Sequence, residues 1–173
     1  MNRRAQVLVI GDFAEYPERN AIAYEMGRFI AENGWVLISR GRGGVMHEAS
    51  QGAYEAGGIV VAILPGNTMD EATPFANIVI PSGIGFARNY TNTLAADVVL
   101  AIGGGTGTLS EIAYAWHENK PIIACSFSGG WSAELAGRTL DYRRDDAIIN
   151  ARTIEEAKAR LVEAVEMCEA EAT

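Results

Sequence analysis

The sequence predicts an α/β fold: a three-layer, doubly wound, Rossmann-like sandwich around a mainly parallel sheet of about six to seven strands. Three observations predict it. Short runs rich in valine and isoleucine recur along the chain, and a segment with helical periodicity follows most of them. Most of the runs lack polar alternation, which is typical of strands buried on both faces of a parallel sheet. The joints are short, as expected for right-handed βαβ units.

The strands are expected where the apolar runs lie, over Gln6–Ile10, Trp35–Ser39, Ile59–Leu64, Ile78–Ile80, Val98–Ile102 and Ile122–Cys125. The helices are expected between them, over Glu18–Asn33, Val45–Ala56, Phe86–Ala96 and Thr108–Asn119. Asn33-Gly34 and Ala56-Gly57 are typical of helix C-termini. Thr153-Ile154-Glu155-Glu156 is a capping box that begins a final amphipathic helix reaching about Glu169. Two longer segments, Pro65–Ala76 and Ser126–Asp146, are expected to be loops used in binding or assembly.

Charge and composition exclude several classes of function. The net charge is −8, from 14 basic and 22 acidic residues. Proteins that bind nucleic acids or anionic membranes carry large basic surfaces, so neither kind of binding is expected. No uncharged apolar run reaches the roughly 18 residues that a transmembrane helix needs. Cys125 and Cys168 lack CxxC spacing, and His47 and His117 lack partners at metal spacing, so neither a disulfide framework nor a metal site is expected. A cytoplasmic protein is therefore expected.

Two glycine-rich loops follow predicted strands, at the edge of the sheet where open α/β folds bind ligands. The first is Gly41-Arg42-Gly43-Gly44, and the second is Gly103-Gly104-Gly105-Thr106-Gly107-Thr108. Glycine lets a ligand approach the backbone closely, and the helix behind each loop offers free N–H groups and a positive dipole end. The threonines add hydroxyl donors. The alternative is that the glycines only form tight turns, but two such loops favour a phosphate site, and residues 1–173 are expected to form one nucleotide-binding domain.

Other phosphate and hydrolase motifs are absent. The P-loop requires a lysine after its glycines, and the two lysines of the chain, Lys120 and Lys158, lie outside both loops. No G-x-G-x-x-G fingerprint follows the first strand, and no G-x-S-x-G motif of an α/β-hydrolase occurs.

Two charged residues near the second loop allow two interpretations each. Thr108-Leu109-Ser110-Glu111 fits a capping box, in which Glu111 serves its own helix. Alternatively, Glu111 binds ribose hydroxyls or stabilises developing positive charge beside the phosphate. Arg88 lies near a helix start, where a cation is unfavourable, so it either faces an anionic ligand or is a solvated surface arginine. Arg40 and Arg42 are further candidates for a phosphate or base contact.

Residues Gly103 to Glu111 resemble the P-G-G-x-G-T-x-x-E motif of the Lonely Guy (LOG) proteins, a superfamily long mislabelled as lysine decarboxylases. LOG proteins hydrolyse the N-glycosidic bond of nucleoside 5′-monophosphates. Arg88 lies 23 residues before Glu111, the spacing of the family's essential arginine and glutamate. The similarity covers about residues 5–125. It implies that Arg88 and Glu111 are catalytic and that the ligand contacts Gly41, Arg42, Gly43, Gly44, Met46, Asn89, Gly104, Gly105, Thr106, Gly107 and Thr108.

The chain departs from the LOG pattern at two of these segments. Gly103 replaces the proline of the motif, and Asn89 replaces the lysine that usually follows the arginine. These changes resemble a short-chain branch that includes molybdenum-cofactor carrier proteins. A pyridoxal-phosphate decarboxylase is excluded, because neither Lys120 nor Lys158 lies at a strand end beside a phosphate loop.

Two hypotheses follow from the resemblance. In the first, the protein hydrolyses nucleoside 5′-monophosphates to free base and ribose 5-phosphate, and Glu111 supports the oxocarbenium-like transition state. In the alternative, it is a non-catalytic carrier or sensor of a phosphorylated ligand, either a pterin-type molybdenum cofactor or a nucleotide. The partner is a small phosphorylated molecule in both cases, with no resident cofactor, no nucleic acid and no membrane. The resemblance also implies a homo-oligomer, either a dimer or a tetramer.

Overall fold

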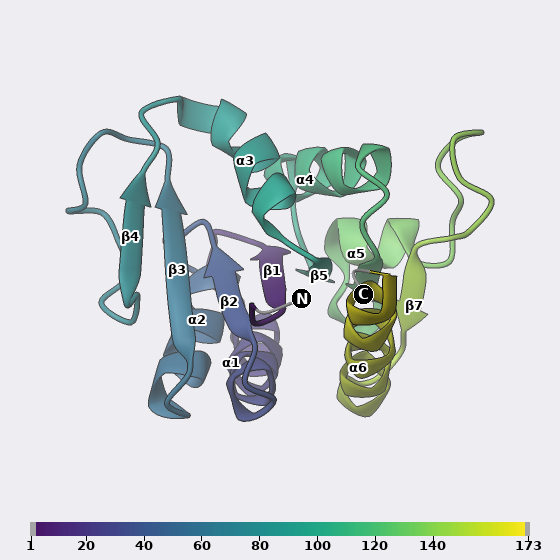
Figure 1. The fold of residues 1–173 in the computed structure, drawn as a ribbon, viewed down its shortest axis with the longest axis horizontal. Coiled ribbons are helices and arrows are strands. Elements are labelled where there is room, and N and C mark those ends of the chain that lie inside the picture. Colours follow the sequence, from purple (N-terminus) through teal and green to yellow (C-terminus); the bar gives the residue numbers. More distant parts are fainter. Residues whose placement is uncertain (1–2, 172–173) are drawn as a thin grey trace.

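A computed structural model describes residues 3–171 and confirms the predicted Rossmann-like α/β fold. Within these residues, seven parallel strands form one sheet in the order β4-β3-β2-β1-β5-β6-β7 (Figure 1). The strands are β1 (Gln6–Gly11), β2 (Val36–Ser39), β3 (Ile59–Leu64), β4 (Ile78–Pro81), β5 (Val98–Ile102), β6 (Ile122–Cys125) and β7 (Ile149–Ala151). The helices are α1 (Pro17–Glu32), α2 (Val45–Glu55), α3 (Arg88–Ala95), α4 (Thr106–His117), α5 (Gly130–Leu135) and α6 (Ile154–Glu171), with single 3₁₀ turns η1 (Gly85–Ala87) and η2 (Ser126–Ser128).

The direction of the chain across the sheet reverses next to β1. From β1 the chain runs outward to β4, returns to β5 on the other side of β1, and continues to β7. Gly11 at the end of β1 is in register with Ile102 at the end of β5. The loops that follow these two strands therefore begin side by side, at the switch point where open α/β sheets bind ligands.

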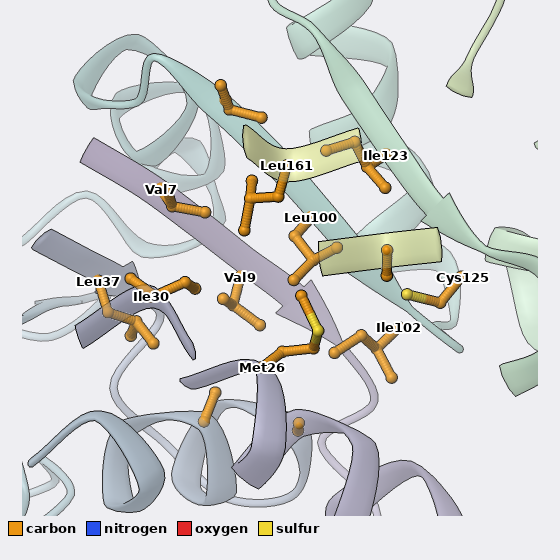
Figure 2. Close-up of a cluster of buried hydrophobic side chains, with 14 of the residues drawn as sticks. Val7, Val9, Met26, Ile30, Leu37, Leu100, Ile102, Ile123, Cys125 and Leu161 are labelled. Atoms are coloured by element: carbon orange, nitrogen blue, oxygen red, sulfur yellow. The ribbon is translucent and has the colours of Figure 1, made fainter. Parts of the chain in front are cut away.

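The helices cover both faces of the sheet and complete three layers. On one face, α1, α2 and α6 pack against alternate strand residues, and Figure 2 shows this cluster, with Val9 of β1 near Met26 of α1 and Val7 farther along the same strand. On the other face, α4 contributes Ile112 and Trp116 to a second cluster, against the opposite residues of the same strands. Because both faces of the central strands are buried, these strands need continuous apolar runs, which is the pattern that predicted them; the edge strand β4 is apolar but largely exposed.

Two segments differ from the expectation. Ser126–Asp146 is not an uninterrupted loop, because it contains η2 and α5, and α5 is fixed by a 2.7 Å hydrogen bond from the Ser132 hydroxyl to the Gly103 carbonyl. The strand β7 was not predicted, since its sequence Ile-Asn-Ala has only three residues with a polar one in the middle; pairing with β6 makes it a strand. In contrast, residues 65–77 between β3 and β4 contain no helix or strand, as expected.

At the C-terminal end, the Thr153 hydroxyl accepts a 3.1 Å hydrogen bond from the Glu156 amide, as a capping box predicts. The Glu156 carboxylate, however, accepts from the amide of Arg152 rather than from that of Thr153.

No helix within residues 3–171 has the length and apolar character that crossing a membrane requires.

Candidate ligand-binding site

The start of α4 decides between the two interpretations of Glu111. The helix begins at Thr106, with Gly105 before it, so Glu111 lies in the second turn rather than at the third helical position. Its carboxylate is fully buried, and neither of its oxygens has a hydrogen-bond partner among the described residues. The Thr108 hydroxyl donates instead to the Gly11 carbonyl at 3.1 Å. The capping-box interpretation of Glu111 is therefore wrong, because glycines before Thr106 let the helix begin two residues earlier.

The amides of the second glycine loop fall into two groups. The Gly103 amide donates to the Ser128 hydroxyl at 2.7 Å, and the Gly104 amide donates to the Asp12 carboxylate at 2.8 Å. These two bonds fix the loop. The next amides, from Thr106 onward, belong to the first turn of α4, and no described side chain caps this helix. They are orphan donors at the positive end of the helix dipole, which is a favourable place for a phosphate.

An ion pair beneath the loop holds it in position. The Asp12 carboxylate accepts from Arg19 at 2.6 Å as well as from the Gly104 amide, and Arg19 Nε donates to the Ser128 carbonyl at 2.8 Å. Gly104 has a φ of 106°, and a Cβ atom there would lie 2.4 Å from Cγ2 of Thr108. A side chain at this position would therefore clash and strain the backbone, so the loop requires glycine. Sequence reasoning missed Asp12 and Arg19; the available signal was an acidic residue directly after the first strand.

The first glycine loop is organised differently. The Gly44 amide at the start of α2 donates to the Glu15 carboxylate at 3.1 Å, so an acidic side chain of the protein already occupies this helix end. This bond, after a larger contribution from Asn20, lowers the pKa of Glu15. The Gly41 amide donates to the Ser39 hydroxyl. Phosphate binding by the Gly41–Gly44 backbone would thus require displacement of Glu15, and it stays a prediction.

Three charged side chains meet behind these loops. Glu111, Arg88 and Arg40 are 0%, 6% and 9% exposed. Arg40 Nε lies 3.8 Å from Glu111 Oε2, and Arg40 Nη2 donates to the Gly11 carbonyl at 2.7 Å. Arg88 Nη1 donates to the Ile63 carbonyl at 3.1 Å. The Nε atoms of both arginines are buried without a hydrogen-bond partner in the described structure. The predicted residues Arg88 and Glu111 are therefore both buried, and Arg40 lies beside them, since its carbonyl accepts from Arg88 and its side chain pairs with Glu111; we call these three residues the triad.

Burial shifts the pKa values of Glu111 and Arg88. Loss of solvation raises the pKa of Glu111 to about 7, although Arg40, Arg88 and the neighbouring Asn92 act in the opposite direction. Burial also lowers the pKa of Arg88 to about 10, with repulsion from Arg40 and Arg42 contributing and Glu111 opposing it. A buried carboxyl group that titrates near neutral pH, in contact with arginines, is a frequent feature of functional sites.

Two cavities open at this edge of the sheet, and the first is lined by two residues of the triad. One, of about 340 Å³, is lined by Phe13, Arg40, Arg42, Met46, Phe86 and Arg88; we call it the arginine cavity. The other, of about 300 Å³, is lined by Phe86, Ala87, Asn89, Thr106, Gly107, Ser110 and Tyr114; we call it the α4 cavity. Phe86 belongs to both walls and is 81% exposed, so it forms a ridge between them.

Most of the predicted site residues thus converge on this edge of the sheet. Arg42, Met46 and Arg88 line the arginine cavity, whereas Asn89, Thr106 and Gly107 line the α4 cavity. Arg42 also pairs with Glu71 of the β3–β4 segment at 3.2 Å. Sequence reasoning did not identify Phe13, Phe86 or Asn92. Within residues 3–171, no group of three or more His, Cys, Asp or Glu side chains is placed to hold a metal ion.

Comparison with known proteins adds independent information. The model of the SLOG cluster4 family matches residues 4–158. An uncharacterised protein from Archaeoglobus fulgidus is 45% identical over 119 residues, which are 69% of this chain and 78% of that protein. The molybdenum cofactor binding protein from Rippkaea orientalis is 34% identical, with a TM-score of 0.82 over 96% of this chain and 99% of that one. The molybdenum cofactor carrier protein from Chlamydomonas reinhardtii is 32% identical, with a TM-score of 0.79 over 95% and 99% of the two chains.

Proposed function

The chain belongs to the SLOG cluster4 family, and on this premise we propose that it binds a phosphorylated pterin-type ligand, such as the molybdenum cofactor, and carries it unchanged. The observation that carries the proposal is the orphan helix start of α4 beside a cavity with three arginines, in a protein of net charge −8. The two similar structures that are named as molybdenum cofactor proteins support the pterin over other phosphorylated ligands.

The residues of the site fit such a ligand. The amides of Thr106 and Gly107 suit a terminal phosphate ester, because charge-assisted bonds to backbone N–H groups at a helix start are favourable. Phe86 and Phe13 expose aromatic faces on which a flat pterin ring stacks. The guanidinium groups of the arginine cavity offer donors to the remaining polar atoms. In this proposal the protein binds, orients and shields the ligand, and no residue has a chemical role.

A retention experiment tests the proposal. Molybdenum cofactor, released without oxygen from a denatured molybdenum enzyme, is mixed with the purified protein and separated by gel filtration. We expect molybdenum and the fluorescence of the oxidised pterin to co-elute with the protein. Arg88→Gln should lose the pterin, whereas Arg138→Gln, at an exposed position after α5, should retain it. Absence of co-elution with the wild-type protein would contradict the carrier function.

A second function is favoured by one specific observation, the buried Glu111 carboxyl group, whose pKa burial raises to about 7 although Arg40 lies 3.8 Å away. In a phosphoribohydrolase, ionised Glu111 would stabilise the oxocarbenium-like sugar of a nucleoside 5′-monophosphate while water attacks the anomeric carbon. Arg88, or water held by it, would have to protonate the leaving base. Base release from a panel of nucleoside 5′-monophosphates, lost in Glu111→Gln, would establish this activity; no release from any of them would exclude it for that panel.

We further propose that the protein is a cytoplasmic homo-oligomer. Both cysteines of the chain are free thiols, which suits a reducing compartment. Tyr90 and Leu94 of α3 and Tyr114 of α4 are partly exposed on neighbouring helices, and Tyr90 contacts Tyr114 with a ring-centroid distance of 5.2 Å. An exposed aromatic surface of this kind suits contact with a second copy. Light scattering should give a mass of at least a dimer, and Tyr114→Glu should yield the monomer.

A further inference from the structure

The triad behind the glycine loops carries more positive than negative charge. Arg40 and Arg88 are both more than nine-tenths buried, and the carboxylate that faces them is that of Glu111. No other ion pair with either arginine is formed within residues 3–171. Two guanidinium groups therefore share at most one negative charge. Burial of unbalanced charge is strongly unfavourable unless a counter-ion completes the site.

Both of these arginines also border a cavity. Arg40 and Arg88 both line the arginine cavity, and the Nε–H of each is buried without a partner in the described chain. Arg42, at the rim, adds a third guanidinium group, whose present partner Glu71 is about half exposed. The depressed pKa of Arg88 has the same origin, namely burial and repulsion from Arg40. Three guanidinium groups with a single buried carboxylate between them leave an excess of positive charge along this cavity, which favours an anionic occupant.

The orphan amides of α4 form a different centre. Thr106 and Gly107, which carry two of these amides, line the α4 cavity, and this cavity shares with the arginine cavity only the ridge residue Phe86. The Arg40 side chain also lies close to the first turn of α4. A Cβ atom on Gly107 would lie 2.8 Å from Arg40 Nη1, so glycine at this position leaves room for the guanidinium group. A cation beside a helix N-terminus is unfavourable in itself. The arrangement therefore raises the positive potential on both sides of Phe86 at once.

We propose that the site contains two anion-binding centres and that its ligand carries two separated anionic groups. A phosphate ester occupies the start of α4, and a second oxyanionic group occupies the arginine cavity, next to Arg40, Arg88 and Arg42. This inference rests on the proposed function, since it takes α4 as the phosphate site. It defines the ligand class more narrowly: a nucleoside monophosphate has one anionic group and leaves the arginine cavity without a counter-ion. A pterin with a phosphate at one end and an oxyanionic metal centre at the other neutralises both.

Tungstate, a tetrahedral oxyanion that scatters X-rays strongly, tests this inference directly. In crystals of the wild-type protein soaked in sodium tungstate, anomalous scattering should reveal two tungsten positions, one at the amides of Thr106 and Gly107 and one among the three arginines. In Arg40→Gln crystals the second position should disappear and the first should remain. A single position that bridges Arg40 and Gly107, or an arginine cavity without tungsten, would overturn the inference. Tungsten in the arginine cavity but not at α4 would instead refute the phosphate site of the proposed function.

Tungstate binding in the arginine cavity can also be measured in solution. Tungstate should raise the unfolding midpoint of the wild-type protein saturably, since an anion that binds only the folded state stabilises it. Arg40→Gln should raise the tungstate concentration for half of this effect at least about tenfold, because charge-assisted hydrogen bonds are lost. Arg138→Gln, which changes net charge equally at an exposed position, should leave it unchanged. Equal responses of all three proteins would place the anion elsewhere and overturn the inference.

Discussion

The substitution Glu111→Gln tests the physical account of the buried triad. Glutamine has nearly the shape of a protonated glutamic acid but carries no ionisable group. Burial raises the pKa of Glu111 from 4.5 to about 7 in the folded protein. Because the folded pKa is raised, the protonated form is favoured by folding. Stability associated with Glu111 is therefore fully present below pH 4.5 and is lost as the pH rises toward and through 7.

The magnitude follows from the size of the shift. A difference of about 2.5 pKa units corresponds to about 3 kcal/mol above pH 7. Glu111→Gln should therefore be more stable than the wild-type protein by about 3 kcal/mol at pH 8 and by less than about 1 kcal/mol at pH 5. For a chain of this size, the larger difference corresponds to an unfolding midpoint roughly 6 to 12 °C higher.

Urea unfolding of the two ligand-free proteins at pH 5, 6, 7 and 8 measures this difference. Glu134→Gln, on the exposed side of α5, is the matched control and should show no such dependence on pH. A variant that is less stable than the wild-type protein at pH 8 would refute the reasoning. It would mean that Arg40 and Arg88 keep Glu111 ionised at all these pH values and that attraction outweighs desolvation.

Three further predictions concern the support of the site. Asp12→Asn removes the charge that pairs with Arg19 while keeping an acceptor for the Gly104 amide. We expect the free energy of unfolding, measured in urea, to fall by about 1–3 kcal/mol and phosphate binding to weaken. Unchanged phosphate binding would show that the Asp12–Arg19 pair does not position the loop. Gly104→Ala should cost more than about 1 kcal/mol, because a Cβ atom would contact Thr108 at 2.4 Å with φ at 106°; a neutral effect on the midpoint would contradict that geometry. Burial raises the pKa of the Cys125 thiol to about 12, so a thiol reagent at pH 8 should label Cys125 only when urea unfolds the protein, and rapid labelling of the native protein would disprove its burial.

The fold was predictable because its signals are local. Six of the strands and five of the helices were identifiable from the apolar pattern of their own residues, although α4 begins two residues before its expected start and α5 lies in a segment expected to be a loop. The strand β7 was not, since Ile149–Ala151 becomes a strand only through pairing with β6. Such a pairing is a tertiary effect that a three-residue sequence does not encode.

The site was predictable in outline but not in its electrostatics. The glycine loops and the spacing of Arg88 and Glu111 indicated a phosphate-binding edge. The sequence pattern Thr108-x-x-Glu111 nevertheless allowed a capping box, because the early start of α4 depends on bonds that Asp12 and Ser128 make to the loop. The role of Arg40 also depends on the fold, which brings the end of β2 against the first turn of α4.

We propose that the protein carries a phosphorylated pterin and releases it intact. The most direct measurement loads the protein with molybdenum cofactor, removes the free cofactor by gel filtration, and adds a cofactor-free molybdenum enzyme. We expect the loaded protein to restore enzyme activity in proportion to its molybdenum content and Arg88→Gln to restore none. Failure of the wild-type protein to retain the cofactor, or retention of a pterin that no longer activates the enzyme, would contradict it.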